Sequence, residues 1–246
     1  TSSGYAANVA TLSTLAALEG ATFFSDELNH ASIIDALRAA KRVAPVYVYP
    51  HLDYGELQRL LTQHCTAALS TSTSLPIVVS DTVFSMDGDR ADLTALAALA
   101  TRHDGVLVVD DAHEVFTPTN ASPGAGIVVV GTLSKRLASQ GGYVAGDSAV
   151  IDLIVNRARP FIFSTALAPP LAATVLAALE LEAGAEGDRL RAALRANLDT
   201  LGCPPAAATA DVRSPIVALV VGSEQAALDA SERLLDAGFL VPAIRP

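Results

Sequence analysis

Short apolar runs alternate with longer amphipathic segments through the first part of the chain. Runs rich in Val, Ile and aromatic residues predict strands at 21–25, 45–49, 76–80, 105–110 and 126–131. Several of these runs are continuously apolar, which is typical of strands buried on both faces of a parallel sheet. Helical spacing with Asn or Asp near the start predicts helices at 29–42, 53–65 and 92–103. This alternation predicts an α/β fold with a mostly parallel, doubly wound central sheet.

The pattern changes after Gly146. Helical spacing continues over 147–158 and 169–201, with a break at 182–188. The last part predicts a strand at 214–222, a helix at 223–238 and a strand at 239–246. We therefore expect a large domain over residues 1–200 and the start of a small α+β domain over residues 201–246.

Composition narrows the classes of function. The chain has 246 residues, of which 51% are hydrophobic, and its net charge is −10. Such a length can bury a large core, and such a charge opposes binding to nucleic acid. Cys65 and Cys203 lie far apart without a CxxC pattern, so we expect neither a disulfide framework nor a zinc site. With no signal-peptide pattern and no long apolar span, the sequence predicts a cytoplasmic protein without a membrane partner.

Chemically active side chains follow four of the predicted strands. Ligands of open parallel sheets bind at the carboxyl ends of the strands, so these residues are the first candidates for a site. They are His30 after the first strand, Asp81, Ser85 and Asp87 after the third, Asp110 and His113 after the fourth, and Thr132 and Lys135 after the fifth. An acid, hydroxyls, imidazoles and an amine should therefore meet at one edge of the sheet.

Lys135 is informative because the chain contains only one other lysine, Lys41, against fourteen arginines. A buried amine loses its proton readily and can form a Schiff base, which a guanidinium cannot do. Pyridoxal 5′-phosphate (PLP) requires such a lysine, together with an acid for its pyridine nitrogen, and Asp110 at the end of an apolar strand suits that acid. Taken singly, Lys135 also fits a solvated turn and the histidines fit caps. "DDAH" could hold a metal, but the sequence offers no matching ligand cluster.

The ordered set of these motifs is more specific than any one of them. "SSGYAAN", "SDELNHAS", "SDTVFSMDGD", "VDDAH", "GTLSKRLASQGGYVAG" and "RPFIFSTALAPP" together resemble the α-oxoamine synthases, PLP-dependent enzymes of the aspartate-aminotransferase fold (fold type I). The resemblance runs along essentially the whole chain. It implies PLP as cofactor, no metal, and a homodimer with active sites at the subunit interface.

The resemblance also implies roles for individual residues. Lys135 would form the Schiff base with PLP and later remove the substrate Cα proton. Asp110 would pair with the pyridine nitrogen, and His30 would stack on the ring. His113 and Ser85 would bond the ring hydroxyl oxygen. The remaining residues would surround the phosphate: Ser3, Gly4, Tyr5, Thr132 and, from the partner subunit, Thr165.

The ending "VPAIRP" and the segment "RPFIFSTALAPP" are most similar to one branch of this family. That branch performs a decarboxylative Claisen condensation of L-alanine with pimeloyl-CoA or pimeloyl-ACP, giving 8-amino-7-oxononanoate in biotin biosynthesis. A glycine C-acetyltransferase, a 5-aminolevulinate synthase-like enzyme and a catalytically inactive PLP-fold paralogue are the alternatives. A Rossmann nucleotide-binding protein is disfavoured, because no GxGxxG follows a first strand.

Three departures from the family pattern accompany the resemblance. The loop between His113 and Lys135 is short and lacks the usual glycine-rich run. Asp81 stands where the family usually has Glu. The family's N-terminal segment and the arginine that binds the substrate carboxylate are expected to lie outside Thr1–Pro246, and Arg245 does not take that arginine's role.

Overall fold

A computed structural model of the chain describes residues 1–65, 74–114, 126–202 and 214–244. Most of the short loop after His113, as well as Cys203 and Arg245, lies outside these residues. Cys65 lies within them as a free, partly buried thiol.

The centre of the molecule is a six-stranded sheet with the order β2-β1-β3-β4-β5-β6. Its first five strands are parallel, as predicted: β1 (Ala21–Asp26), β2 (Val46–Tyr49), β3 (Leu75–Asp81), β4 (Val106–Asp110) and β5 (Gly126–Thr132). A sixth strand, β6 (Gly142–Ala145), pairs antiparallel with β5 and was not predicted, because its sequence is short and begins with glycine. The register sets Asp81 opposite Asp110, so two carboxylates share the carboxyl edge of the sheet.

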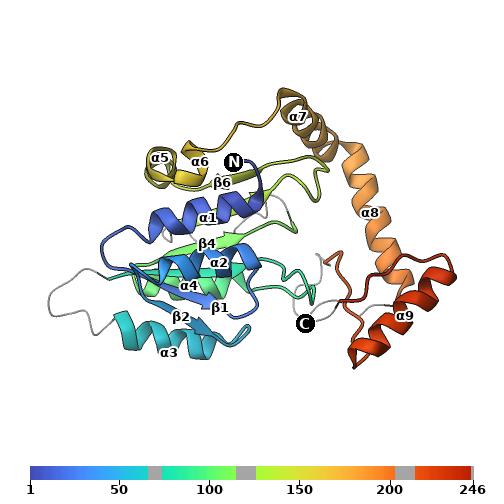
Figure 1. The fold of residues 1–246 in the computed structure, drawn as a ribbon, viewed down its shortest axis with the longest axis horizontal. Helices are drawn as coiled ribbons and strands as arrows, with labels where there is room; N and C mark the ends of the chain where they lie inside the picture. Colours follow the sequence, from blue (N-terminus) through green and yellow to red (C-terminus); the bar gives the residue numbers. More distant parts are fainter. Residues whose placement is uncertain (66–73, 115–125, 203–213, 245–246) are drawn as a thin grey trace.

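Two pairs of helices cover the two faces of this sheet (Figure 1). Residues of α1 (Gly4–Leu15) and α2 (Ala31–Ala40) pack on one face, and residues of α3 (Tyr54–Cys65) and α4 (Leu93–Arg102) pack on the other. Ser3 caps α1 by accepting from the amide of Ala6, and Asp92 caps α4 by accepting from the amide of Ala95.

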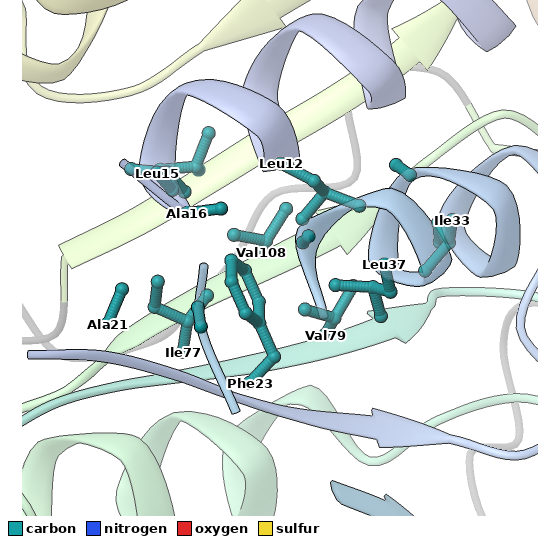
Figure 2. Close-up of a cluster of buried hydrophobic side chains, with 14 of the residues drawn as sticks. Leu12, Leu15, Ala16, Ala21, Phe23, Ile33, Leu37, Ile77, Val79 and Val108 are labelled. Atoms are coloured by element: carbon teal, nitrogen blue, oxygen red, sulfur yellow. The ribbon is translucent and has the colours of Figure 1, made fainter. Parts of the chain in front are cut away.

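The continuously apolar strands supply both cores, because successive side chains point to opposite faces. Phe23 and Val79 are buried beneath α1 and α2, as Figure 2 shows. Their chain neighbours Phe24 and Val78 are buried against α3 and α4. This confirms the prediction of strands that are covered on both faces.

The rest of the chain is mainly helical. Its helices are α5 (Ser148–Arg157), α6 (Arg159–Ile162), α7 (Pro169–Ala183), α8 (Ala185–Thr200) and α9 (Glu224–Asp236). The predicted break between two long helices is confirmed, and it falls at Gly184, which lies between α7 and α8. Figure 1 shows α7, α8 and α9 on one side of the sheet, with α8 leading from α7 toward α9.

The two predicted C-terminal strands were wrong for the described part of the chain. Residues 214–222 and 239–244 are irregular, and within the described residues neither segment pairs with a strand. Their apolar side chains are open to solvent, with Val220 91% and Leu240 86% exposed. An apolar run forms a strand only where a neighbouring strand satisfies its backbone, and no described segment does so here. The domain division at residue 200 stays a prediction.

Among the helices that the structure describes, none combines the length and apolar character needed to cross a membrane.

Candidate active site

A cavity of about 250 Å³ opens at the carboxyl edge of the sheet. It is bounded by the ends of β3, β4 and β5 and by the first residues of α1 and α2. Eight of the predicted site residues line it: Ser3, Gly4, Tyr5, His30, Asp110, His113, Thr132 and Lys135. The expected convergence at one edge of the sheet is therefore observed.

One end of the cavity is built from the start of α1 and the end of β5. Gly4 opens the helix directly against Thr132, where an added Cβ would lie 2.8 Å from the threonine Cβ. The hydroxyls of Thr132 and Ser134 are 2.8 Å apart, and both residues line the cavity. The first amides of a helix have no partner within the helix and attract anions. Glycine, two hydroxyls and a helix N-terminus together form a site that suits a phosphate group.

The lining of the cavity also includes a buried acid. Asp110 is the last residue of β4 and is 7% exposed. One of its oxygens accepts from the amide of Ala112 at 3.0 Å, and the other accepts from the Asn8 side-chain amide at 2.5 Å. Burial raises the pKa of Asp110, and these two hydrogen bonds oppose the rise by stabilising the carboxylate.

Asp81 lies beside Asp110 and responds differently. Burial, and then the charge of Asp110, raises the pKa of Asp81 well above its ordinary value. Among the residues that the structure describes, its side chain accepts one long hydrogen bond, from the His30 backbone amide at 3.5 Å. Two adjacent buried carboxylates do not both ionise readily, so the proton belongs on Asp81 and the charge on Asp110.

Lys135 and His113 stand together at the mouth of the cavity. The Lys135 Nζ lies 2.7 Å from the His113 Nε2. Burial lowers the pKa of the lysine amine. Burial, followed by the charges of Lys135 and His30, lowers the pKa of His113 to about 4. The neutral His113 imidazole can therefore accept a hydrogen bond from the Lys135 amine. An amine that loses its proton readily is a nucleophile.

Asn8 and Ser32 also line the cavity and were not predicted as site residues. Both are buried, and the Asn8 amide bridges the Ser32 hydroxyl and Asp110. Asn8 falls inside the quoted stretch "SSGYAAN", but nothing in that stretch indicates a contact with a residue 102 positions away.

Three predicted residues lie away from this cavity. Ser85 and Asp87 line a separate cavity of about 560 Å³, together with residues from Ile216 onward. Thr165 is exposed between α6 and α7. The structure contains one chain, so the role of Thr165 in a partner's site stays a prediction.

A larger cavity of about 670 Å³ adjoins the first one and shares His113 and Lys135 with it. Its apolar wall comes from the two long helices and the segment after Lys135: Leu137, Ala178, Leu181, Leu190 and Leu194. Three arginines also line it. Arg136 and Arg191 both pair with Glu182, whereas Arg195 has no ion pair with any residue in the described part of the chain. A chain-like ligand with an anionic end would suit this lining.

The donor set favours an organic ligand over a metal ion. No group of three His, Cys, Asp or Glu side chains in the described ranges could hold a metal. The cavity offers instead an amine, one carboxylate ready to ionise and a helix N-terminus, which is the set that a charged ring bearing a phosphate would use.

Comparison with known proteins agrees with this geometry. The family model described as aminotransferase class I and II matches residues 1–246. An 8-amino-7-oxononanoate synthase of Burkholderia orbicola is 44% identical over 262 residues, covering 100% of this chain and 61% of that protein. The corresponding enzyme of Paraburkholderia phymatum is 41% identical, covering 100% and 63%. The chain thus spans about three-fifths of the length of these curated relatives.

Solved structures extend the comparison to the fold. A serine palmitoyltransferase from S. paucimobilis, with a PLP–myriocin aldimine bound, superimposes with a TM-score of 0.81 at 28% identity, covering 98% of this chain and 63% of that one. An 8-amino-7-oxononanoate synthase from Francisella tularensis gives a TM-score of 0.75 at 23% identity, covering 100% and 72%. These likenesses confirm the predicted fold class.

Proposed function

Because this chain belongs to the aminotransferase class I and II family, we propose that its smaller cavity binds PLP and that the protein is a PLP-dependent acyltransferase. One observation carries the proposal. A lysine amine with a lowered pKa and a buried carboxylate line the same cavity as a glycine-opened helix N-terminus. Amine, acid and anion site are the three features that PLP requires.

The residues present fit the cofactor. Lys135 would hold the aldehyde carbon, Asp110 the pyridine nitrogen, and the Gly4 and Thr132 end of the cavity the phosphate. The imidazoles of His30 and His113 line the space between them. When bound, PLP supplies an electron sink that stabilises negative charge on the substrate carbon next to it.

Lys135 is the residue we assign to proton transfer. Burial lowers its pKa, so its amine can take a proton from the substrate carbon once it is released from the cofactor. His113, 2.7 Å away and neutral at ordinary pH, orients that amine by accepting a hydrogen bond from it. Asp110 keeps its charge beside the ring nitrogen throughout.

We propose that the substrates are L-alanine and a pimeloyl thioester, joined with loss of CO₂. The product named for the curated relatives has a terminal carboxylate, a methylene chain, a ketone and an amine. The chain and carboxylate must come from the acyl donor, and the amine from the amino acid. The larger cavity supports such a donor, since it joins Lys135 to an apolar wall and to Arg195.

Borohydride trapping tests the cofactor. Protein incubated with PLP and reduced should carry a pyridoxyl group on the peptide that contains Lys135. The Lys135→Ala variant should lose this label. Lys41→Ala, which removes the chain's only other lysine, should retain it. A label found on Lys41 alone, or no label at all, would refute the Schiff-base assignment.

A thioester pair tests the acyl donor. Pimeloyl-CoA and heptanoyl-CoA differ only in the terminal carboxylate, so their ratio of dissociation constants isolates its contribution. Arg195→Gln should reduce the preference for pimeloyl-CoA about ten-fold or more, because one charged hydrogen bond is lost. Arg189→Gln on the same helix is the matched control, since Arg189 pairs with Glu186 outside the cavity. An unchanged preference in Arg195→Gln would refute the assignment.

Turnover separates the alternative functions. Condensation of alanine with pimeloyl-CoA supports the main proposal. Preferred use of glycine with acetyl-CoA would indicate a glycine C-acetyltransferase, and glycine with succinyl-CoA a 5-aminolevulinate synthase-like enzyme. Trapped PLP on Lys135 without turnover of any thioester would indicate a catalytically inactive paralogue.

We further propose that the protein is a homodimer. Exposed aromatic side chains just before Thr165 support this arrangement, with Phe161 42% and Phe163 72% exposed. Sedimentation equilibrium tests it. A monomer at micromolar concentration would refute it.

A further inference from the structure

Asn8 is a buried residue of α1 that lines the smaller cavity. The residue is 1% exposed, and its amide nitrogen makes two contacts. Nδ2 donates to the Ser32 Oγ at 2.8 Å and to the Asp110 Oδ2 at 2.5 Å. The amide oxygen has no hydrogen-bond partner among the residues that the structure describes. Both protons of this amide are therefore committed to acceptors, one of which is the acid of the site.

The hydrogen bonds continue from Ser32 to His30, and their donors and acceptors can be assigned. The Ser32 backbone amide donates to the His30 Nδ1 at 3.2 Å, so that nitrogen is an acceptor. The Ser32 hydroxyl lies 2.7 Å from the same Nδ1, and its oxygen already accepts from Asn8. The hydroxyl proton can then serve only Nδ1. In a neutral imidazole the proton of His30 must consequently lie on Nε2.

We propose that Asn8 is a positioning residue: anchored by Ser32, its amide holds the Asp110 carboxylate charged and oriented toward the cavity. The same contacts set the tautomer of His30. Asn8 itself would donate to neither cofactor nor substrate, because both protons of its amide point to protein groups. This assignment rests on the proposed binding of PLP, since it acts through the acid that would face the ring nitrogen.

The burial of Asp110 makes the hydrogen bond from Asn8 important for keeping its carboxylate charged. His30 and Lys135 favour the charged carboxylate from their sides of the cavity, while burial disfavours it. Asp81, on the neighbouring strand, adds an acid directly opposite. Within the described ranges, Asp110 accepts from two donors, the Ala112 backbone amide and the Asn8 side-chain amide. Removing the Asn8 amide takes away one of the hydrogen bonds that offset the cost of burying the carboxylate.

Two cofactor analogues separate positioning from general damage to the fold. PLP carries the ring nitrogen that Asp110 would face, and 1-deaza-PLP lacks it. Asn8→Leu should weaken binding of PLP by about ten-fold or more, the loss expected for one charged hydrogen bond. It should leave the dissociation constant of 1-deaza-PLP nearly unchanged. Asn8→Gln tests whether an amide donor from a longer side chain restores part of the preference.

Ser32→Ala provides the second arm. It keeps the contact between Asn8 and Asp110 but removes the hydroxyl that serves His30. In apoprotein labelled with ¹⁵N-histidine, the His30 Nδ1 and Nε2 resonances report which nitrogen carries the proton. The native protein should show the Nε2-protonated form, and Ser32→Ala should shift the ring toward a mixture. A native His30 protonated on Nδ1 would overturn the proposed contact direction.

Each remaining outcome has one meaning. Equal weakening of both analogues in Asn8→Leu would make Asn8 merely structural, and no weakening of either would leave it without a role. Both results overturn the inference. Failure of the native protein to bind PLP would instead refute the proposed function, and a native protein that binds both analogues equally would refute the role of Asp110.

Discussion

Gly4→Ala tests the close approach of α1 to the end of β5. The new Cβ would lie 2.8 Å from the Thr132 Cβ and 3.3 Å from its Oγ1, whereas its distance of 3.5 Å to the Thr132 Cα is ordinary. Carbon atoms pack at about 3.5–4.0 Å, so helix and strand must separate by several tenths of an ångström. Overpacking of this kind costs about 1–3 kcal/mol. The better helix propensity of alanine offsets less than about 1 kcal/mol of that cost.

A double-mutant cycle isolates the contact. Urea unfolding should give a net loss of about 1–2 kcal/mol for Gly4→Ala in the native background. Gly4→Ala should cause the same loss in the Thr132→Ala background, because alanine keeps the Cβ that clashes. In the Thr132→Gly background there is no Cβ at position 132 to clash with, so Gly4→Ala should be neutral or slightly stabilising.

The cycle also has a clear negative result. Costs of Gly4→Ala that agree within about 0.5 kcal/mol in the Thr132→Ala and Thr132→Gly backgrounds would mean that the two sites are independent. The reasoning from the Cβ contact would then be wrong. In the native background, Gly4→Ala should also weaken PLP binding, because the separation opens the end of the cavity assigned to the phosphate.

Three further predictions concern stability. Burial and nearby positive charge lower the pKa of His113 from 6.5 to about 4. The contribution of His113 to the free energy of unfolding is therefore fully present above pH 6.5 and is lost as the pH falls toward 4. In urea unfolding at a series of pH values, His113→Asn should reduce this loss of stability. Burial lowers the pKa of His51, but hydrogen bonds to Asp26 and Asp89 outweigh it and raise the pKa above 6.5. The contribution of His51 to the free energy of unfolding is therefore fully present below pH 6.5 and is lost at higher pH. His51→Gln should lower the free energy of unfolding more near pH 6 than near pH 8. The reverse order would contradict the pairing of His51 with Asp26 and Asp89. Phe23→Ala, at a fully buried position, should cost about 3–5 kcal/mol, and a loss under about 1 kcal/mol would contradict its place in the core.

The main architecture could be predicted from the sequence because its signals are local. A strand buried on both faces must be apolar at consecutive positions, and Asp is a preferred first residue before a helix, so "PIVVS" and the Asp92 cap can be recognised without a structure. The site followed by one geometric rule, since side chains after parallel strands meet at one edge. Asp110 and Lys135 were found in this way.

The errors have the opposite origin. Residues 214–222 have the composition of a strand, but a strand exists only where a neighbour satisfies its backbone, and that depends on what lies beside it in space. β6 was missed for the converse reason, since β5 supplies its partner although its sequence is short and starts with glycine. Ser85 comes after the correct strand, but the turn that follows carries it into another cavity.

The sequence by itself determined the parallel α/β sheet, the edge at which the chemistry gathers, and the amine and acid that stand there. Only the tertiary structure decided which partners those groups have. Asn8 reaches Asp110 across 102 positions, and Lys135 meets His113 across 22. The physical reason is that a buried charge takes its properties from whatever dipoles surround it in space. Those dipoles come from helices and strands whose contact no local pattern records.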